Sequence, residues 1–336
     1  MKKILYILPL LFLFSCTEKT DIKPYYFSGE ALGTTYHITA IPTNDITILT
    51  SKDIDSVIVA IDNSLSTYQN NSLISRLNKG EVLQVDQQFT DVYKAAKKIY
   101  IETGGMYDPT IGILVNAWGF GPTKKMEGIE KNKKIVDSLK RYVGYDMIGI
   151  DEQGFFKKKY PQIYVDYNSI AKGYAIDRVG KMLINKGFNN YLVEIGGEVL
   201  AKGMNTFKNR DWLVAIDNPN REDSDKFISR LKLRNQAMAT SGNYRKFYID
   251  KETGKKYVHT LNPKSGFPIQ SNLLSASVVA ENCTLADGYA TAFMVLGFEK
   301  TKTFLKKHPE LKAFLVYSDT QGKIQTYKTN SLNIVR

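Results

Sequence analysis

Asp287 and Thr291 are the two residues whose types and spacing most directly indicate chemistry. They stand four positions apart in an apolar segment, so on a helix their oxygens share one face. A carboxylate and a hydroxyl are hard oxygen ligands that suit Mg²⁺, which completes its shell with waters and substrate phosphates. The residues alone leave an alternative, in which Asp287 caps the start of the helix and Thr291 packs inside.

A second candidate is the segment from Asp166 to Tyr174, which reads as a strand that turns into a helix. Backbone N–H groups at the start of a helix attract anions, and Lys172 adds a positive charge near the same end. Asp166 adds a carboxylate that can hold a hydroxyl or an amine. The alternative is that Asp166 is only a cap and Lys172 only a surface charge.

His259 is the third candidate, at the end of a predicted strand and just before a turn that contains Pro263 and Gly266. An imidazole in this position can accept a proton near neutral pH. A half-buried strand histidine without a catalytic role is the alternative. The other histidines are His37 and His308, and no pair has metal-ligand spacing, so we expect no zinc site. The sequence also lacks a P-loop, a GxSxG elbow and a dinucleotide-binding fingerprint.

The net charge of the chain indicates which classes of binding partner are expected. It has 46 basic and 34 acidic residues, a formal net charge of +12. A lysine-rich solvated surface accounts for this excess, and the alternative is attraction to anionic phosphate ligands or lipid headgroups. No nucleic-acid-binding motif is present, so we expect no nucleic-acid partner.

The N-terminal segment predicts export and lipidation. Lys2 and Lys3 precede an apolar run to Phe14 that is too short to span a bilayer and is typical of a signal peptide. The run ends in Leu13-Phe14-Ser15-Cys16, the pattern of a lipoprotein cleavage site. We therefore expect a signal peptide at 1–15, a lipid on Cys16, a tether at 17–26 and the folded domain at 27–336. The only other cysteine is Cys283, so an acylated Cys16 leaves no intrachain disulfide.

Helical and strand-like hydrophobic periodicity alternate along the chain, and their mixture predicts an α+β fold in one continuous domain. Helices are expected over 52–65, 91–103, 135–143, 171–186, 285–296 and 301–307. Strands are expected over 25–41 with a break at Gly33, and over 162–166, 191–195, 212–216, 228–233, 237–239, 247–249, 257–261, 274–280, 313–318 and 324–328.

Taken together and in order, these segments closely resemble the ApbE family, the FAD:protein FMN transferases. The resemblance covers about residues 27 to 330. The segments that carry it are Gly29–Tyr36 (GEALGTTY), Leu65–Tyr68 (LSTY), Ser72–Asn78 (SLISRLN), Thr103–Thr110 (TGGMYDPT), Asp166–Asp177 (DYNSIAKGYAID), Tyr191–Gly197 (YLVEIGG), Ala239–Tyr244 (ATSGNY), His259–Pro268 (HTLNPKSGFP) and Ala286–Gly297 (ADGYATAFMVLG).

The resemblance implies a fold of antiparallel sheets packed with helices, with two lobes and an FAD and Mg²⁺ site between them. It implies transfer of FMN from FAD to a Ser or Thr hydroxyl of a target protein, with release of AMP. Typical targets are exported subunits of redox complexes. With the predicted anchor, this places the protein on a bacterial membrane, facing the periplasm.

Roles for individual residues also follow from the resemblance. Asp287 and Thr291 would bind the metal through their side chains, and Ser169 through its backbone carbonyl. His259 would activate the attacking hydroxyl, and Ser241 and Gly242 would border the same cleft. The residues expected to contact FAD are Leu32, Tyr68, Met106, Tyr107, Asp108, Asp166, Lys172 and Thr260.

Three positions depart from the family's pattern. Leu32 replaces a methionine, Met106 replaces a small alanine, and Asn262 replaces an aspartate but still allows an Asx-type turn. Two rival functions remain open at this point. One is an FAD pyrophosphatase, in which water takes the place of the protein hydroxyl, and the other is a non-catalytic FAD-binding lipoprotein.

Overall fold

A computed structural model of the chain describes residues 23–43, 48–219, 226–243, 247–249, 254 and 256–335. The predicted signal peptide, Cys16 and most of the predicted tether lie outside these ranges. The first strand begins at Tyr25, so the folded part starts inside the range predicted as tether. Within the described ranges, no helix combines the length and the apolar character needed to cross a membrane.

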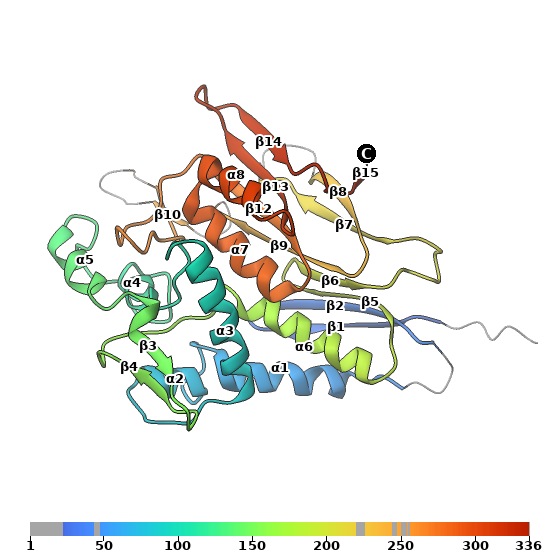
Figure 1. The fold of residues 1–336 in the computed structure, drawn as a ribbon, viewed down its shortest axis with the longest axis horizontal. Coiled ribbons are helices and arrows are strands. Elements are labelled where there is room, and N and C mark those ends of the chain that lie inside the picture. Colours follow the sequence, from blue (N-terminus) through green and yellow to red (C-terminus); the bar gives the residue numbers. More distant parts are fainter. Residues whose placement is uncertain are drawn as a thin grey trace, which may run out of the picture.

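The framework is an eight-stranded sheet in which every pair of neighbouring strands is antiparallel (Figure 1). This arrangement, covered by helices, confirms the predicted α+β class. In the order of the sheet the strands are β1 (Tyr25–Ala31), β2 (Thr34–Ile41), β5 (Asn190–Ile195), β6 (Glu198–Lys202), β9 (Gln236–Gly242), β12 (Leu273–Ala280), β13 (Lys312–Ser318) and β14 (Ile324–Lys328).

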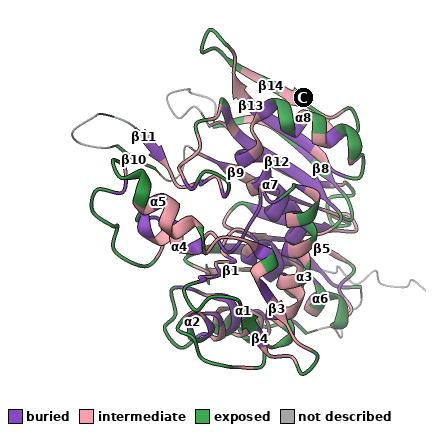
Figure 2. Cartoon of the chain, turned by 60° about the vertical axis from the view of Figure 1, so that its left-hand side comes forward, coloured by how far each residue is buried: buried purple, intermediate pink, exposed green. Residues whose placement is uncertain are grey.

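Helices cover one face of this sheet, and α7 is the most deeply buried of them (Figure 2). Asn282 caps its start by accepting a hydrogen bond from the Leu285 N–H group, and Gly297 ends it with a φ of 76°. Because α7 is apolar on nearly all sides, it has to lie inside the core. The helices on this face are α1 (Ser51–Leu65), α3 (Gln87–Glu102), α6 (Ala171–Asn185), α7 (Cys283–Leu296) and α8 (Phe298–Lys307).

A small sheet covers the opposite face of the main sheet. It has the order β15 (Ile334–Val335), β8 (Phe227–Leu233) and β7 (Trp212–Asp217). Alternate side chains of the two sheets meet in a second apolar cluster, in which Trp212 and Leu231 pack with Met238 and Val316. The central strands β6, β9, β12 and β13 therefore have apolar side chains covered on both faces, while the outer face of the edge strand β1 is exposed.

A smaller lobe lies beside the main sheet and its helices, and it has its own apolar cluster. Its elements are α4 (Gly112–Ala117), α5 (Lys133–Lys140), β10 (Phe247–Ile249) and β11 (Lys256–Val258). Trp118 lies at its centre, against the rings of Tyr257 and Phe267, and its indole N–H donates to the Gly266 carbonyl at 2.9 Å. This cluster corresponds to the second lobe that the family resemblance implies.

Two predicted strands differ from the structure. Residues 162–166 form no named strand, and Tyr164 makes only an isolated bridge to Ile111. The Asn78 side chain donates to the Val165 carbonyl and accepts from the Val165 N–H group, both at 2.8 Å, so a side-chain amide takes the place of a second strand beside Val165. Residues 237–239, expected as a strand of three residues, belong to the longer strand β9 of the main sheet. Shorter elements that the sequence did not predict are α2 (Leu73–Asn78), α4, β3 (Ile148–Ile150), β4 (Phe156–Lys158), β6 and β15.

Candidate active site

A cavity of about 310 Å³ lies between the helical face of the main sheet and the smaller lobe. With one exception, the residues predicted to form the site all line it. They are Tyr68, Met106, Tyr107, Asp108, Asp166, Ser169, Lys172, His259, Thr260, Asp287 and Thr291. The same cavity is bordered by Ser241 and Gly242. The structure thus brings together segments that are far apart in the sequence, while the role of each residue stays a prediction.

Leu32 is the exception. It occupies the two-residue turn between β1 and β2 with Gly33, and both have positive φ values, of 53° and 74°. Such a turn matches the twist of a hairpin but is uncommon for a leucine. Its side chain packs against the main core and does not line the cavity in the described structure. Its predicted contact with the flavin remains a prediction.

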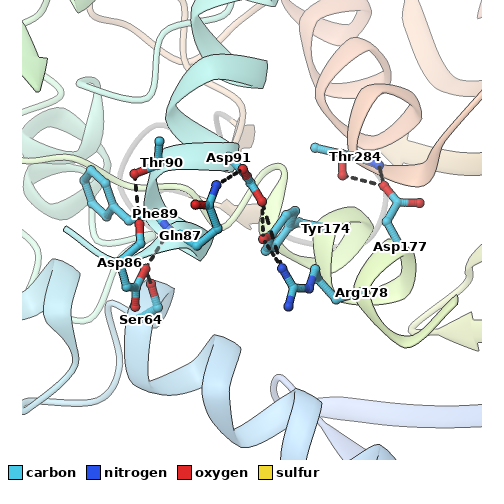
Figure 3. Close-up of polar contacts among 10 residues, drawn as sticks. All are labelled: Ser64, Asp86, Gln87, Phe89, Thr90, Asp91, Tyr174, Asp177, Arg178 and Thr284. Atoms are coloured by element: carbon cyan, nitrogen blue, oxygen red, sulfur yellow. Dashed lines mark hydrogen bonds and ion pairs between the residues drawn. The ribbon is translucent and has the colours of Figure 1, made fainter. Parts of the chain in front are cut away.

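The floor of the cavity is formed where α6 and α7 meet. The Gly173 N–H group of α6 donates to Asp287 Oδ2 at 3.1 Å. One turn further along α6, the carboxylate of Asp177 accepts hydrogen bonds from the N–H groups of Cys283 and Thr284, each at 2.8 Å (Figure 3 shows the Thr284 side). Two connections one helical turn apart therefore fix the position of α7, and of Asp287 on it, against α6.

Gly173 is required by this close approach. A Cβ atom at this position would stand 2.3 Å from the Cys283 carbonyl oxygen and 2.9 Å from the Asp287 Cβ. Both distances are shorter than real contacts allow, and the first obstacle is backbone, which cannot swing away. The glycine of the Ala171-Lys172-Gly173 segment therefore lets the backbone N–H reach Asp287 directly.

Asp287 is not the cap of its helix, since Asn282 has that role. Its carboxylate lies in the second turn of α7 and is only 4% exposed. Burial and, next, the negative charge of Glu198 hold the pKa of this carboxyl well above its ordinary range, while Lys172 opposes them. The floor thus concentrates buried negative charge, and a cation bound there would relieve it.

Lys172 forms an ion pair with Glu198 at the floor. Its Nζ atom stands 2.7 Å from Glu198 Oε1, and Glu198 is only 3% exposed. Lys172 also lines the cavity, so its charge is not merely a surface charge. Asp166 does not cap α6 either, because the N-cap is Ile170; its carboxylate instead accepts from the Asn168 N–H group at 2.8 Å in an Asx turn.

The donor set at the floor fits a hard cation such as Mg²⁺. Thr291 Oγ1 lies within hydrogen-bond distance, 3.2 Å, of Ser241 Oγ, and Ser169 Oγ donates to the Tyr107 hydroxyl at 3.1 Å. In the described part of the chain no cluster of three or more His, Cys, Asp or Glu residues exists that could hold a metal alone. A cation would therefore depend on Asp287 together with hydroxyl, carbonyl and water oxygens, as Mg²⁺ does.

The wall that carries Met106, Tyr107 and Asp108 follows a turn at Gly104 and Gly105, which have φ values of 61° and 77°. Asp108 Oδ1 accepts from the N–H and hydroxyl of Thr110, and Oδ2 accepts from the Tyr145 N–H group. Burial nevertheless raises the pKa of the Asp108 carboxyl to about 6. These hydrogen bonds hold the loop rigidly against the core.

His259 and Thr260 form the opposite wall, directly after β11. The His259 ring meets the ring of Phe120 edge-on, with 6.4 Å between centroids, and the Thr260 hydroxyl donates to Asn243 Oδ1 at 3.0 Å. Asn262 Oδ1 accepts from the Lys264 N–H group at 2.8 Å, which confirms the Asx-type turn expected there. Tyr68 stands at the rim and is 60% exposed.

Glu198 is the site residue that the sequence reasoning missed. It directly follows Gly196 and Gly197, where the quoted motif ended, and it opens a buried strand. A carboxylate in the first, buried position of a core strand was the available signal, because such a group is rarely buried without a partner. Asp177 belongs to the motif Asp166–Asp177, but its hydrogen bonds to the first N–H groups of α7 are visible only in the structure.

Comparisons with known proteins agree with this architecture. The model of the ApbE family matches residues 32–315. A FAD:protein FMN transferase of Haemophilus influenzae is 34% identical over 322 residues, which cover 93% of this chain and 91% of the relative. One of Vibrio cholerae is 34% identical over 301 residues, covering 87% of this chain and 86% of the relative.

Solved structures give the same result for the fold. The flavin transferase ApbE from Vibrio cholerae superimposes with a TM-score of 0.82 at 30% identity, covering 92% of this chain and 98% of that one. The apo form of the flavinyl transferase ApbE from Pseudomonas stutzeri gives a TM-score of 0.80 at 29% identity, covering 92% and 95%. The sequence, the two-lobed fold and the residues that line the cavity lead to one conclusion: this chain belongs to the ApbE family.

Proposed function

We propose that this protein transfers FMN from FAD to a Ser or Thr hydroxyl of an exported protein and releases AMP, with Mg²⁺ as cofactor. Its relatives in the family are FAD:protein FMN transferases. The observation that carries the proposal is the cavity itself, which places the Asp287 and Thr291 pair, Lys172 and His259 around one space between two lobes.

The residues around the cavity suit binding of FAD. The loop with Met106, Tyr107 and Asp108 would hold the adenosine part of FAD. The ring of Tyr68 is exposed, so a flat ring system can stack on it. Lys172 would face the pyrophosphate with its positive charge. Mg²⁺ bound by Asp287, Thr291 and the Ser169 carbonyl would neutralise the pyrophosphate and stabilise the departing phosphate of AMP.

The transfer step requires one bond to form and one to break. The acceptor hydroxyl oxygen attacks the FMN-side phosphorus, and the bond from this phosphorus to the bridging oxygen breaks, so that AMP leaves with that oxygen. His259 would take the hydroxyl proton as general base. Because a protein segment has to enter, the rim beside His259 and Tyr68 must stay accessible, and alignment of the acceptor supplies much of the rate.

A direct test mixes the purified protein with FAD, Mg²⁺ and a candidate acceptor domain. Flavin fluorescence that stays with the acceptor band in a denaturing gel is the expected result. Free FMN and AMP formed equally without acceptor would identify a pyrophosphatase instead. Tight FAD binding without any turnover, in the presence of several exported redox subunits, would identify a non-catalytic flavin-binding protein.

We also propose that Cys16 carries a lipid that anchors the protein to a bacterial membrane on the side that faces the periplasm. Support comes from the sequence of residues 1–16 alone. Mass spectrometry of the protein purified from membranes should find Cys16 as an acylated N-terminus. A Cys16→Ala protein without its leader should keep its transferase activity in solution; loss of that activity would contradict a purely anchoring role.

A further inference from the structure

Glu198 is a buried carboxylate that the proposed function does not use. It is the first residue of β6, follows the tight turn at Gly196 and Gly197, and lines the cavity beside the floor. With 3% of its surface exposed, it has lost almost all of its hydration. A charge in such a place is costly unless every oxygen finds a partner.

The two oxygens of Glu198 differ in what they contact. Oε1 is held 2.7 Å from Lys172 Nζ. Oε2 is fully buried and has no hydrogen-bond partner among the described residues. Buried polar atoms are nearly always paired, so an orphaned oxygen in a cavity wall indicates a missing donor, which a ligand or its water would supply.

The surroundings of Glu198 indicate what kind of ligand this is. Asp287 is close enough for the charge of Glu198 to act on it, and Lys172 is the cation that opposes their repulsion. Two buried carboxylates with one lysine attract a further cation. A Mg²⁺ ion with few protein ligands keeps several bound waters, and those waters are strong hydrogen-bond donors.

We propose that Glu198 is a positioning residue of the metal site: one oxygen fixes Lys172 at the floor, and the other accepts a hydrogen bond from a water on the ion bound by Asp287 and Thr291. This inference rests on the proposed function, because it assumes a metal at Asp287. It adds an indirect contact from β6 to a site otherwise built by α7 and by the segment just before α6. Residues that hydrogen-bond to the ligands of a metal, without contacting the metal, orient those ligands and raise the affinity for the metal.

The test measures binding of Mn²⁺, as a spectroscopic substitute for Mg²⁺, to the full-length folded chain in the absence of FAD. Electron paramagnetic resonance counts the free ion in each titration. In Glu198→Gln an amide donor faces the bound water where an acceptor is needed. The dissociation constant for Mn²⁺ should therefore rise about 10- to 100-fold.

Glu194→Gln is the matched control. Glu194 lies on the neighbouring strand β5, interacts electrostatically with both Glu198 and Lys172, and also has a buried oxygen without a partner among the described residues. It does not belong to the residues that line the cavity. Its neutralisation should change the Mn²⁺ affinity far less, so the comparison separates a specific contact from a general loss of negative charge.

The outcomes distinguish this inference from the proposed function. If the wild type binds Mn²⁺, Asp287→Ala loses it and Glu198→Gln keeps it unchanged, the role of Glu198 is wrong while the metal site stands. Equal weakening in Glu194→Gln would also overturn the inference. A wild type that binds no Mn²⁺ would overturn the metal assignment and the inference together. If Glu198→Gln does not fold, Glu198→Asp, which keeps the charge but is too short to reach both partners, should show the same loss, and unchanged affinity would contradict the proposal.

Discussion

The floor and the rim of the cavity are built in opposite ways. At the floor, Asp287 and Glu198 are almost fully buried, and α7 is tied to α6 by three backbone N–H groups that donate to carboxylates. At the rim, Tyr68 is 60% exposed, and His259 follows a hairpin of the smaller lobe. The floor therefore has a position fixed by packing, while the rim is open to solvent.

This difference between floor and rim suits two tasks that need different precision in the positions of atoms. Binding of a metal and a pyrophosphate requires oxygens held to within a fraction of an ångström, which only buried and doubly connected elements provide. Admission of a protein hydroxyl requires open space and a base that can be approached. Substitutions at the floor should thus affect metal binding and stability, and those at the rim should affect turnover or nucleotide affinity alone.

The largest effect is expected for Asp287→Ala at the floor. It removes the one carboxylate that the proposed metal site offers directly, so metal-dependent turnover should fall to the background rate and Mn²⁺ binding should be lost. Flavin transfer and Mn²⁺ titration check both. Asp55→Ala, on the exposed side of α1, is the control and should behave as wild type. Near-normal turnover of Asp287→Ala would refute the metal assignment.

At the rim, His259→Gln should reduce the rate of transfer by about 10²- to 10⁴-fold, the usual contribution of a general base. The affinity for Mn²⁺ and the midpoint of thermal unfolding should stay close to those of the wild type. The control is His308→Gln, at the end of α8, where the ring stacks on Phe304 and does not line the cavity. If His259→Gln lost metal binding as well, the proposed separation of floor and rim would fail.

Gly173→Ala tests whether close approach fixes the floor. The new methyl group would meet the Cys283 carbonyl, so α6 and α7 have to move apart, at a cost of about 1–3 kcal/mol in the free energy of unfolding. Urea denaturation measures this cost, and weaker Mn²⁺ binding should accompany it because Asp287 loses its N–H donor. Gly149→Ala in β3, where the added atom meets nothing within 4 Å, is the matched control. Equal stability of the two variants would argue against the constraint.

The smallest effect is expected for Tyr68→Ala. An exposed ring that stacks on FAD contributes about 0.5–1.5 kcal/mol, so the dissociation constant for FAD should rise about two- to tenfold. Tyr68→Phe keeps the ring and should restore most of the affinity. Isothermal titration with FAD measures both variants. A loss of stability in Tyr68→Ala would show that the ring belongs to the core instead of the rim.

Elements with a continuous apolar pattern were predictable from the sequence. The α7 segment has its helical spacing, an Asn282 cap and a Gly297 stop within the sequence, and its observed range begins two residues before the predicted one. The hairpin of β13 and β14 was predictable for the same reason, since its strand pattern and the turn at Gly322 are local. Local patterns determine these elements, so no knowledge of distant contacts is needed.

Features that depend on distant partners were not predictable in this way. The strand expected over 162–166 is reduced to one isolated bridge at Tyr164, and Asn78, 87 positions away, satisfies the Val165 backbone. The ion pair of Glu198 with Lys172 was not predictable either, since the resemblance placed Lys172 at FAD without its acidic partner. The residues proposed for the site came first from residue types and spacing and then from the family resemblance, but the contacts that hold them in place required the structure.

The central claim, that this cavity transfers FMN onto another protein, is tested most directly by the mass of the acceptor. A candidate acceptor is incubated with FAD, Mg²⁺ and either the wild type or Asp287→Ala, and AMP is measured in the same sample. The account predicts one FMN added through a phosphoester to a single Ser or Thr, one AMP released per acceptor, and neither product with Asp287→Ala. An unmodified acceptor beside free FMN and AMP, or an addition that proceeds equally with Asp287→Ala, would contradict it.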